Sequence, residues 1–256
     1  MTQPAGAPWT SGVARIAVLS GAGISTDSGI PDFRGPQGLW TRDPGAERLA
    51  TYQAYLSDPA LRRRSWLARL AHPAWSAVPN AGHTALVRLA AAFDTWVITQ
   101  NIDGLHQRAG TPPERVLELH GTMFRTVCVG CGERAAMATA LDRVRAGEAD
   151  PPCRRCGGVL KSATVMFGQP LDRAVLSEAV RAAAGADLMI AVGSTLTVEP
   201  AASLCSVAAD AGASLVVVNR DPTPYDRLAA EVIREPIGVA LPRIADELLD
   251  SVARRG

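Results

Sequence analysis

Four cysteines form the clearest chemical pattern in the sequence. Cys128 and Cys131 make one Cys-x-x-Cys pair, and Cys153 and Cys156 make a second pair after a gap of 21 residues. Two such pairs can surround one ion, and four soft sulfur ligands in a tetrahedron suit Zn²⁺. Because the protein would fill all four positions, we expect one structural Zn²⁺ and reaction chemistry elsewhere. Two disulfides are the alternative, which the absence of a secretory pattern at the start of the chain disfavours.

A glycine-rich segment follows the first apolar run. Gly21, Ala22 and Gly23 stand where a strand would turn into a helix, and main-chain N–H groups at such a turn can bind a phosphate. Thr26 replaces the third glycine of the dinucleotide fingerprint, so a plain tight turn is the alternative. The segment continues to residue 35 with an aromatic residue, an arginine and two aspartates, which is typical of a functional lid.

Polar residues also follow the second apolar run. Gln100, Asn101 and Asp103 stand at the expected carboxyl end of a parallel strand, where open α/β sheets bind ligands. These side chains suit sugar hydroxyls and a carboxamide. His120 lies beside a glycine further along and is a candidate general base, with a structural histidine as the alternative. A structural role is expected for the other histidines: His72, His83 and His106.

These segments must be positioned by the elements around them. Short apolar runs predict buried strands, and helical patterns alternate with them, so we expect a parallel sheet covered on both faces. Two segments interrupt the alternation: residues 122–162, which hold the cysteines, and the arginine-rich helical residues 49–75. The remaining residues, 12–48, 76–121 and 163–251, would form one discontinuous sheet domain. The expected strands are 16–20, 95–99, 187–192, 214–218 and, more weakly, 231–234; the expected helices are 81–92, 171–184, 201–211 and 241–253.

The composition argues against several classes of protein. The chain has 256 residues, of which 47% are hydrophobic, enough for one sizeable core. Its formal net charge is only +1, which disfavours a nucleic-acid-binding zinc ribbon. No apolar run reaches membrane-spanning length. With free thiols and a zinc pattern, this indicates a cytoplasmic protein. Cys205 stands in an apolar helical stretch and is expected to be a buried hydrophobe.

Seven motifs in register resemble the sirtuin family of NAD-dependent protein deacylases. They are GAGISTDSGIPDFRG (21–35), TQNIDGLHQRAG (99–110), ELHG (118–121), the four cysteines, MFGQ (166–169), GSTLTVEP (193–200) and VVVNRDPT (216–223). Together they extend over nearly the whole chain, about residues 14–244. The resemblance implies an α/β fold. A Rossmann-like parallel sheet domain with helices on both faces would carry an inserted small zinc-ribbon and helical module.

The resemblance also implies roles for individual residues. His120 would be the general base, and Asn101 and Asp103 would be catalytic residues in the nicotinamide pocket. The substrate peptide would add as a strand between residues 167–168 and the loop at 197–199. Residues that would contact NAD are Gly21, Ala22, Gly23, Thr26, Asp32, Phe33, Arg34, Trp40, Gln100, Asn101, Ile102, Asp103, His120, Gly193, Ser194, Thr195, Asn219, Arg220 and Ile237. Those that would contact the acyl-lysine substrate are Val165, Met166, Phe167, Gly168, Val198, Trp66 and Arg69.

The implied reaction consumes NAD as a co-substrate. The enzyme would hold the amide oxygen of acyl-lysine beneath the sugar carbon that loses nicotinamide, and it would exclude water. A neutral His120 would then draw a proton through the ribose hydroxyls. The products would be lysine, nicotinamide and O-acyl-ADP-ribose. Activity should fall on the acid side as His120 becomes protonated.

Two departures from the family pattern concern the substrate. Gln169 stands where the family commonly has an acidic residue after Phe-Gly. The branch that removes succinyl and malonyl groups has Tyr-x-x-Arg where this chain has Trp66 and Arg69, so the arginine is present without the tyrosine. A surface arginine is the interpretation that we favour for Arg69, because long basic side chains usually reach water. We therefore predict a deacetylase, with longer-chain or acidic acyl groups as alternatives.

Other functions remain open at this point. One is a mono-ADP-ribosyltransferase, in which a side chain rather than the acyl oxygen attacks the ribose. Another is a catalytically quiet NAD- or zinc-binding module, which the presence of His120, Asn101 and Asp103 disfavours. Expected partners are acyl-lysine proteins, with no direct binding of nucleic acid or membranes, and a monomer is expected.

Overall fold

The centre of the computed structural model, which describes residues 7–33, 35 and 38–254, is a six-stranded parallel sheet. Its strand order is β3-β2-β1-β7-β8-β9, the order of doubly wound nucleotide-binding sheets. The direction of strand addition reverses at β1, so the loops after β1, β2 and β7 meet at one edge. The strands are β1 (Arg15–Ser20), β2 (Asp94–Thr99), β3 (Val116–Glu118), β7 (Leu188–Val192), β8 (Ser214–Val218) and β9 (Glu231–Ile233).

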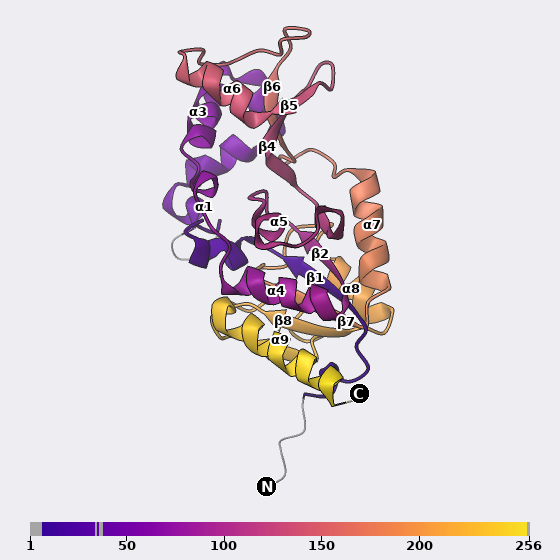
Figure 1. Cartoon of the computed structure of the whole chain (residues 1–256). Coiled ribbons are helices and arrows are strands. Elements are labelled where there is room, and N and C mark those ends of the chain that lie inside the picture. The colour runs from indigo at the N-terminus through magenta and orange to yellow at the C-terminus, as the bar shows by residue number, and fades with distance from the viewer. Residues whose placement is uncertain (1–6, 34, 36–37, 255–256) are drawn as a thin grey trace.

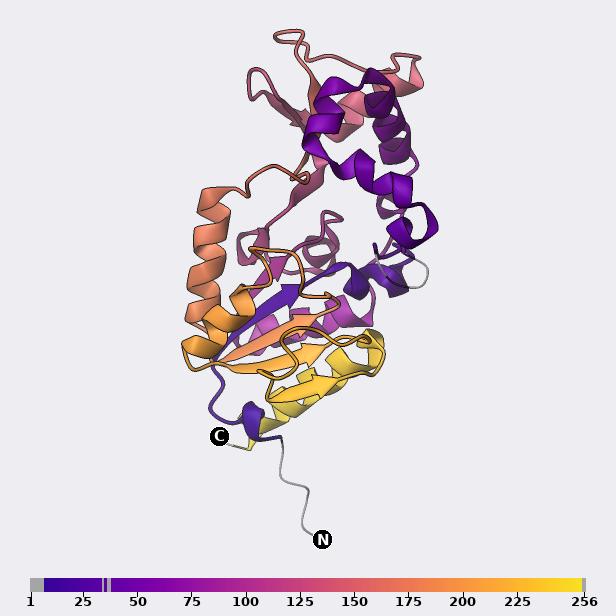
Figure 2. The ribbon, with the colours of Figure 1, turned by 180° about the vertical axis from the view of Figure 1, so that it is seen from behind.

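Helices cover both faces of this sheet, as predicted (Figures 1 and 2). Successive side chains of a strand point to opposite faces, so an almost wholly apolar strand can serve two cores. In β1, Ile16 and Val18 belong to the core under α4 and α9, whereas Ala17 and Leu19 belong to the core under α7 and α8. The bounds of these helices are α4 (Ala81–Ala92), α7 (Arg173–Ala184), α8 (Leu204–Asp210) and α9 (Ile237–Ala253).

All four predicted helices form, but three of them begin elsewhere. α7 begins at Arg173 because the Asp172 carboxylate caps it, accepting a hydrogen bond from the main-chain N–H of Ala174. α8 begins three residues later than predicted, since residues 199–203 form turns. α9 begins four residues earlier, directly after Pro236, and tolerates Pro242 inside it. The edge strand β3 was not predicted, because only three residues pair with β2.

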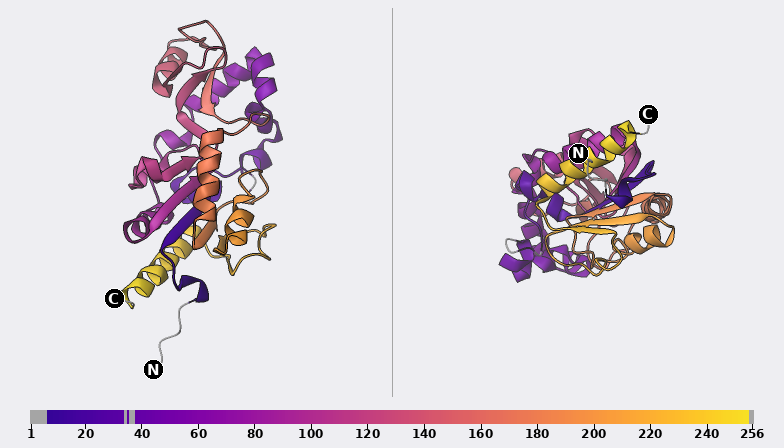
Figure 3. Two further views of the ribbon diagram at one scale, coloured as in Figure 1. Left: turned by 90° about the vertical axis from the view of Figure 1, so that its right-hand side faces the viewer. Right: turned by 90° about the horizontal axis from the view of Figure 1, so that it is seen from below.

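A second body lies beyond one end of the sheet (Figure 1; Figure 3, left). It contains a three-stranded antiparallel sheet of order β5-β4-β6. Trp66 of α3 packs with Met137 and Leu141 of α6 in one hydrophobic core, so the helical and cysteine-bearing insertions form a joint module. Its elements are α2 (Tyr52–Ser57), α3 (Pro59–Leu70), β4 (Gly121–Cys128), β5 (Arg134–Ala136), α6 (Met137–Arg145) and β6 (Leu160–Thr164).

Short helices connect the two bodies and the strand ends. η2 (Ala22–Ser28) follows β1, α1 (Leu39–Arg42) follows the glycine-rich segment, and α5 (Leu105–Ala109) follows β2. Among the described residues, no helix is both long and apolar enough to cross a membrane.

Candidate functional site

The loops after β1 and β7 contact each other through main-chain atoms. The main-chain N–H of Gly23 donates to the Gly193 carbonyl at 2.8 Å, and Gly193 has a φ of +64°. A Cβ atom at Gly21 would lie 2.6 Å from the Gly193 carbonyl oxygen, closer than atoms can pack. Glycine is therefore required for this approach, in which the N–H groups of Gly21, Gly23 and Gly193 all donate to main-chain carbonyls. This glycine cradle, at the start of η2 and at the switch point of the sheet, lies where doubly wound folds bind the phosphates of a dinucleotide.

A buried cluster of hydrogen-bonded polar side chains lies next to this cradle. Asn101 Nδ2 donates to the Gly21 carbonyl at 3.0 Å and to Ser25 Oγ at 3.2 Å. Ser25 Oγ in turn donates to Asp103 Oδ2 at 2.7 Å, while Asp103 Oδ1 accepts from the N–H of Leu105. Asn101 is 8% and Asp103 is 4% exposed, so these bonds fix the two side chains in a site shielded from water. Ser25 lies within the glycine motif but was not among the predicted site residues.

His120 is held in one tautomer. Its Nδ1 lies 2.9 Å from the Gln100 carbonyl oxygen, which can only accept, so Nδ1 carries the proton and Nε2 is the basic nitrogen. Burial lowers the pKa of His120, and the hydrogen bond to Gln100 opposes this shift in part. A neutral imidazole at neutral pH, with its orientation fixed by backbone, is what a general base requires.

The other two site-proximal histidines are structural, as expected. His106 is 1% exposed, and its Nε2 lies 2.8 Å from Ser20 Oγ. Burial lowers the pKa of His106 to about 3 and that of His83 to about 4, so both rings are neutral. Their ring centroids are 5.0 Å apart. His72 caps a short helix by accepting from the N–H of Ala74.

The segment after β6 runs beside His120. The N–H of Val165 donates to the His120 carbonyl at 2.8 Å. Phe167 pairs through both its main-chain groups, its N–H with Ala50 and its carbonyl with Tyr52. On this side of the predicted peptide site, Gly168, at φ +88°, makes no main-chain hydrogen bond among the described residues. Gln169 Oε1 accepts from the N–H of Met166, a bond that the acid common in the family could also accept.

The predicted residues of the lid lie around the same edge. Thr26 Oγ1 donates to the Gly23 carbonyl, and Asp32 accepts from the N–H of Gly35, closing a turn. Phe33 is 40% exposed. The side chains of two predicted residues are not described: Arg34 lies outside the described residues, and Trp40 is described only as part of α1.

The remaining predicted residues follow β2, β7 and β8. Gln100 Nε2 lies 3.3 Å from Ser194 Oγ, and this contact joins the loop after β2 to the loop after β7. Between Ser194 and Val198, Leu196 takes a φ of +52°, a strained value that the sequence analysis did not foresee. The other predicted residues lie in the same loops or at the start of α9. The Ile102 carbonyl accepts from the N–H of Met123, and the Thr195 hydroxyl bonds to that of Thr197. The Asn219 amide donates to the Asp221 carbonyl, Arg220 forms an ion pair with Asp221, and Ile237 is the N-terminal residue of α9.

The four predicted metal ligands converge in the joint module. Their sulfur atoms all lie within 4.8 Å of one another, with Cys128 and Cys156 3.5 Å apart and Cys131 and Cys153 3.7 Å apart. A tetrahedron of Zn–S bonds would place sulfurs about 3.8 Å apart. All four cysteines are free, and disulfide sulfurs would be much closer, so the disulfide alternative is wrong. The donor set and its geometry fit one structural Zn²⁺.

Comparison with known proteins decides the family. The Sir2 family model matches residues 21–200, a stretch that includes the glycine cradle, the buried polar cluster, His120 and the four cysteines. The chain belongs to the Sir2 family. NAD-dependent protein deacetylase 2 of Streptomyces coelicolor is 59% identical to it over 230 residues, covering 90% of this chain and 95% of the relative. NAD-dependent protein deacylase 2 of Pyrobaculum aerophilum is 41% identical over 232 residues, covering 90% of each.

Solved Sir2 structures confirm the fold class. A Sir2 enzyme of 38% identity superposes with a TM-score of 0.85, covering 95% of this chain and 96% of that one. Another, of 33% identity, superposes with a TM-score of 0.83 over 94% of this chain and 95% of its own. That second protein holds a deacetylated peptide together with 3′-O-acetyl-ADP-ribose.

Two residues of this Sir2 protein differ from their expected surroundings. Trp66 is 2% exposed in the core of the joint module, and its indole N–H points to Asp150, so we do not retain it as a substrate contact. Arg69 is partly buried, so the expectation of a surface arginine is wrong. Burial lowers the pKa of Arg69 to about 10, and no described residue accepts a hydrogen bond from its guanidinium. Nearby Tyr55 is its main electrostatic neighbour.

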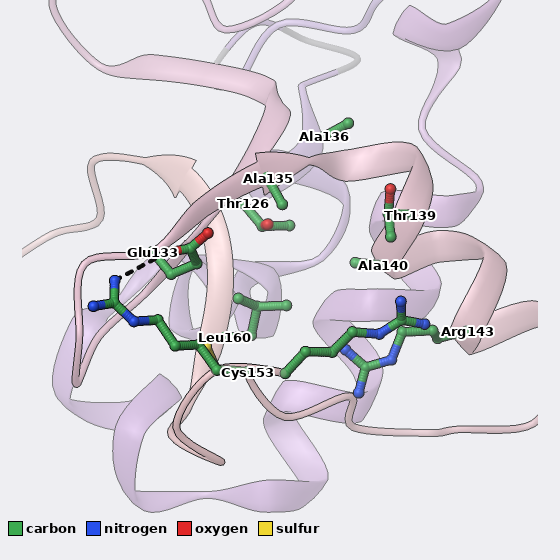
Figure 4. A pocket seen from close by; sticks show the side chains of 11 residues that line it. Thr126, Glu133, Ala135, Ala136, Thr139, Ala140, Arg143, Cys153 and Leu160 are labelled. Carbon is green, nitrogen blue, oxygen red and sulfur yellow. Dashed lines mark hydrogen bonds and ion pairs between the residues drawn. The ribbon is translucent and has the colours of Figure 1, made fainter.

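A cavity of about 420 Å³ lies elsewhere in this Sir2 protein, on the joint module (Figure 4). Thr126, Ala140 and Leu160 line it, and Arg143 and the ion pair between Arg155 and Glu133 flank it. Apart from Cys153, its lining includes none of the predicted site residues, so we assign it no part in the reaction.

Proposed function

We propose that this Sir2-family protein is an NAD-dependent protein-lysine deacylase and that acetyl-lysine is its main substrate. The observation that carries the proposal is His120, whose Nδ1 is tied to the Gln100 carbonyl so that Nε2 is left as a base. The name of the Streptomyces relative, a deacetylase at 59% identity, supports the same activity.

Each part of the site would have a separate task. The main chain at the start of η2, beside the contact between Gly23 and Gly193, would bind the phosphates of NAD. Asn101 and Asp103, fixed through Ser25, would hold the carboxamide of nicotinamide and exclude water. When bound, NAD supplies a sugar carbon that becomes electrophilic as nicotinamide leaves.

The acyl-lysine would approach along residues 165–168. Since the N–H of Val165 is bonded to the His120 carbonyl, this segment and the base are held in register. His120 Nε2 would accept the proton released as a ribose hydroxyl attacks the acyl carbon. Acyl-lysine, NAD and water would give lysine, nicotinamide and O-acyl-ADP-ribose.

A peptide assay tests the proposal directly. An acetyl-lysine peptide should lose its acetyl group only when NAD is present, with one nicotinamide released for each acetyl group transferred. Mass spectrometry of the peptide and of the nucleotide products measures both. Label from NAD appearing on protein instead of on O-acetyl-ADP-ribose would point to mono-ADP-ribosyl transfer and contradict the proposal.

Arg69 favours a second candidate activity, removal of acidic acyl groups. Its guanidinium is partly buried, carries its charge at neutral pH and has no acceptor among the described residues. A partly buried cation without a hydrogen-bond acceptor favours the binding of an anion, and a carboxylate pairs well with a guanidinium.

Substitution of Arg69 tests this candidate. Arg69→Met should lower kcat/KM for a succinyl-lysine peptide by roughly tenfold or more, the cost of one charge-assisted hydrogen bond, with little effect on an acetyl-lysine peptide. Arg64→Met, on the exposed side of the same helix, is the matched control and should change neither value. Equal losses on both peptides would rule out a carboxylate at Arg69.

Several further expectations belong to the same proposal. The near-neutral charge supports a protein that does not bind nucleic acid directly, and the free cysteines support a reducing cytoplasm. A monomer is proposed. Residues 12–48, 76–121 and 163–251 are proposed as the NAD-binding domain, with residues 49–75 and 122–162 as its two insertions.

A further inference from the structure

The only lysine of the chain is buried. Lys161 lies in β6 and is 3% exposed, which is rare for lysine unless its charge is satisfied. Its Nζ donates to the carbonyl oxygens of Ser162 at 2.9 Å and Thr164 at 2.6 Å. No described residue forms a salt bridge with it, so main-chain carbonyls alone compensate the ammonium.

These carbonyls belong to the outer row of an edge strand. β6 pairs with β4 on one side only, and the Val159 carbonyl accepts from the N–H of Val129 on that side. Carbonyls of alternate residues point the same way along a strand, so those of residues 160, 162 and 164 face away from β4. Tyr55 Oη donates to the Leu160 carbonyl at 2.8 Å. Tyr55 and Lys161 therefore supply donors to the whole outer row.

The same strand leads directly into the proposed active site. The β4–β6 register shifts between Gly121 and Thr126, so regular pairing is interrupted opposite residues 162–164. Lys161 binds β6 at this interruption. One residue later, the N–H of Val165 donates to the His120 carbonyl. The hydrogen bond from Lys161 to the Thr164 carbonyl therefore constrains the peptide unit that also carries the Val165 N–H.

We propose that Lys161 is a positioning residue: by binding the Ser162 and Thr164 carbonyls, its ammonium holds residues 165–168 in register with His120. This proposal depends on the proposed function in one respect only, which is the identity of the substrate that residues 165–168 bind. Charge strengthens the anchor. Burial, together with Arg69 and Arg134 nearby, lowers the pKa of Lys161 to about 8, so most of the ammonium is protonated at neutral pH. Hydrogen bonds from a charged donor are about twice as strong as neutral ones.

Lys161→Met tests the anchor, because methionine has a similar shape but no donor. We expect KM for an acetyl-lysine peptide to rise roughly tenfold, the loss of charged hydrogen bonds, with KM for NAD unchanged. Lys161→Arg keeps donors and charge and should retain most of the peptide affinity. Arg145→Met, on the exposed surface of α6, is the control for loss of a cation and should match the wild type.

Hydrogen exchange of the main chain gives a readout that does not depend on activity. Residues 165–169 should exchange faster in Lys161→Met than in the wild type, while the strands beside the cysteines stay protected. Unchanged exchange, unchanged KM for the peptide, or equal losses in the Met and Arg variants would overturn the role of Lys161. If the Met variant does not fold, Lys161→Gln replaces it with the same expected losses and the same criteria. A wild type inactive on every acyl peptide would refute the proposed function, while the exchange measurement would still decide the role of Lys161.

Discussion

Replacing His120 by tyrosine should lower the rate of deacylation by about two to four orders of magnitude, the usual contribution of a general base. Tyrosine cannot accept a proton at neutral pH, and its ring cannot reproduce the bond from Nδ1 to the Gln100 carbonyl. His120 is only partly buried, so the substitution should leave zinc content and thermal unfolding close to those of the wild type. Steady-state kinetics on an acetyl-lysine peptide, together with metal analysis and a melting curve, measure all three.

A histidine outside the site supplies the control. His72 caps a short helix, and His72→Asn keeps a side chain that can accept the same hydrogen bond, so activity should be retained. The wild-type pH profile provides an independent check. Since burial lowers the pKa of His120, kcat/KM should stay level near pH 7 and fall about tenfold per pH unit only below the ordinary imidazole value of about 6.5. Substantial deacylation by His120→Tyr would show that another group is the base.

The sheet and the metal ligands were predictable because their signals are local. Each buried strand is a short apolar run, and each helix has its own repeat, so the alternation was visible without any knowledge of contacts. The cysteine spacing identifies a zinc site for the same reason, since the chemistry of the ligands is contained in two short motifs. The family motifs then located His120, Asn101 and Asp103 at the edge where the strand ends meet.

What was missed depends on contacts between distant parts of the chain. Ser25 is one serine among several until its hydroxyl is seen between Asn101 and Asp103. Trp66 has a residue type suited to a substrate pocket, but it packs against α6, more than 70 residues further on. Rules for isolated side chains failed in the same module: Arg69 and Lys161 are long and basic, yet neither is exposed.

Removal of zinc should abolish activity by unfolding the joint module. Binding of a structural zinc ion contributes roughly 10–16 kcal/mol in small zinc domains, as much as the whole stability of a typical domain. The hydrophobic core of the module includes Cys128 and Cys153, so loss of the ion leaves closely packed sulfurs without a partner. The module contributes β4 and β6, which run from the cysteines to His120 and Val165. Its unfolding should therefore displace the base and the substrate segment together.

Cys156→Ser tests this link with the least disturbance of packing, because Cys156 is the exposed ligand. We expect loss of stoichiometric zinc, a separate low-temperature unfolding transition and deacetylation reduced by at least about a hundredfold, since a misplacement of 1 Å can already cost that much. Cys205→Ser is the matched control: Cys205 is buried in the other core under α8, so it should retain zinc and activity with only a modest loss of stability. Full activity in a zinc-free Cys156→Ser protein would show that the sheet domain positions His120 and residues 165–168 without the metal.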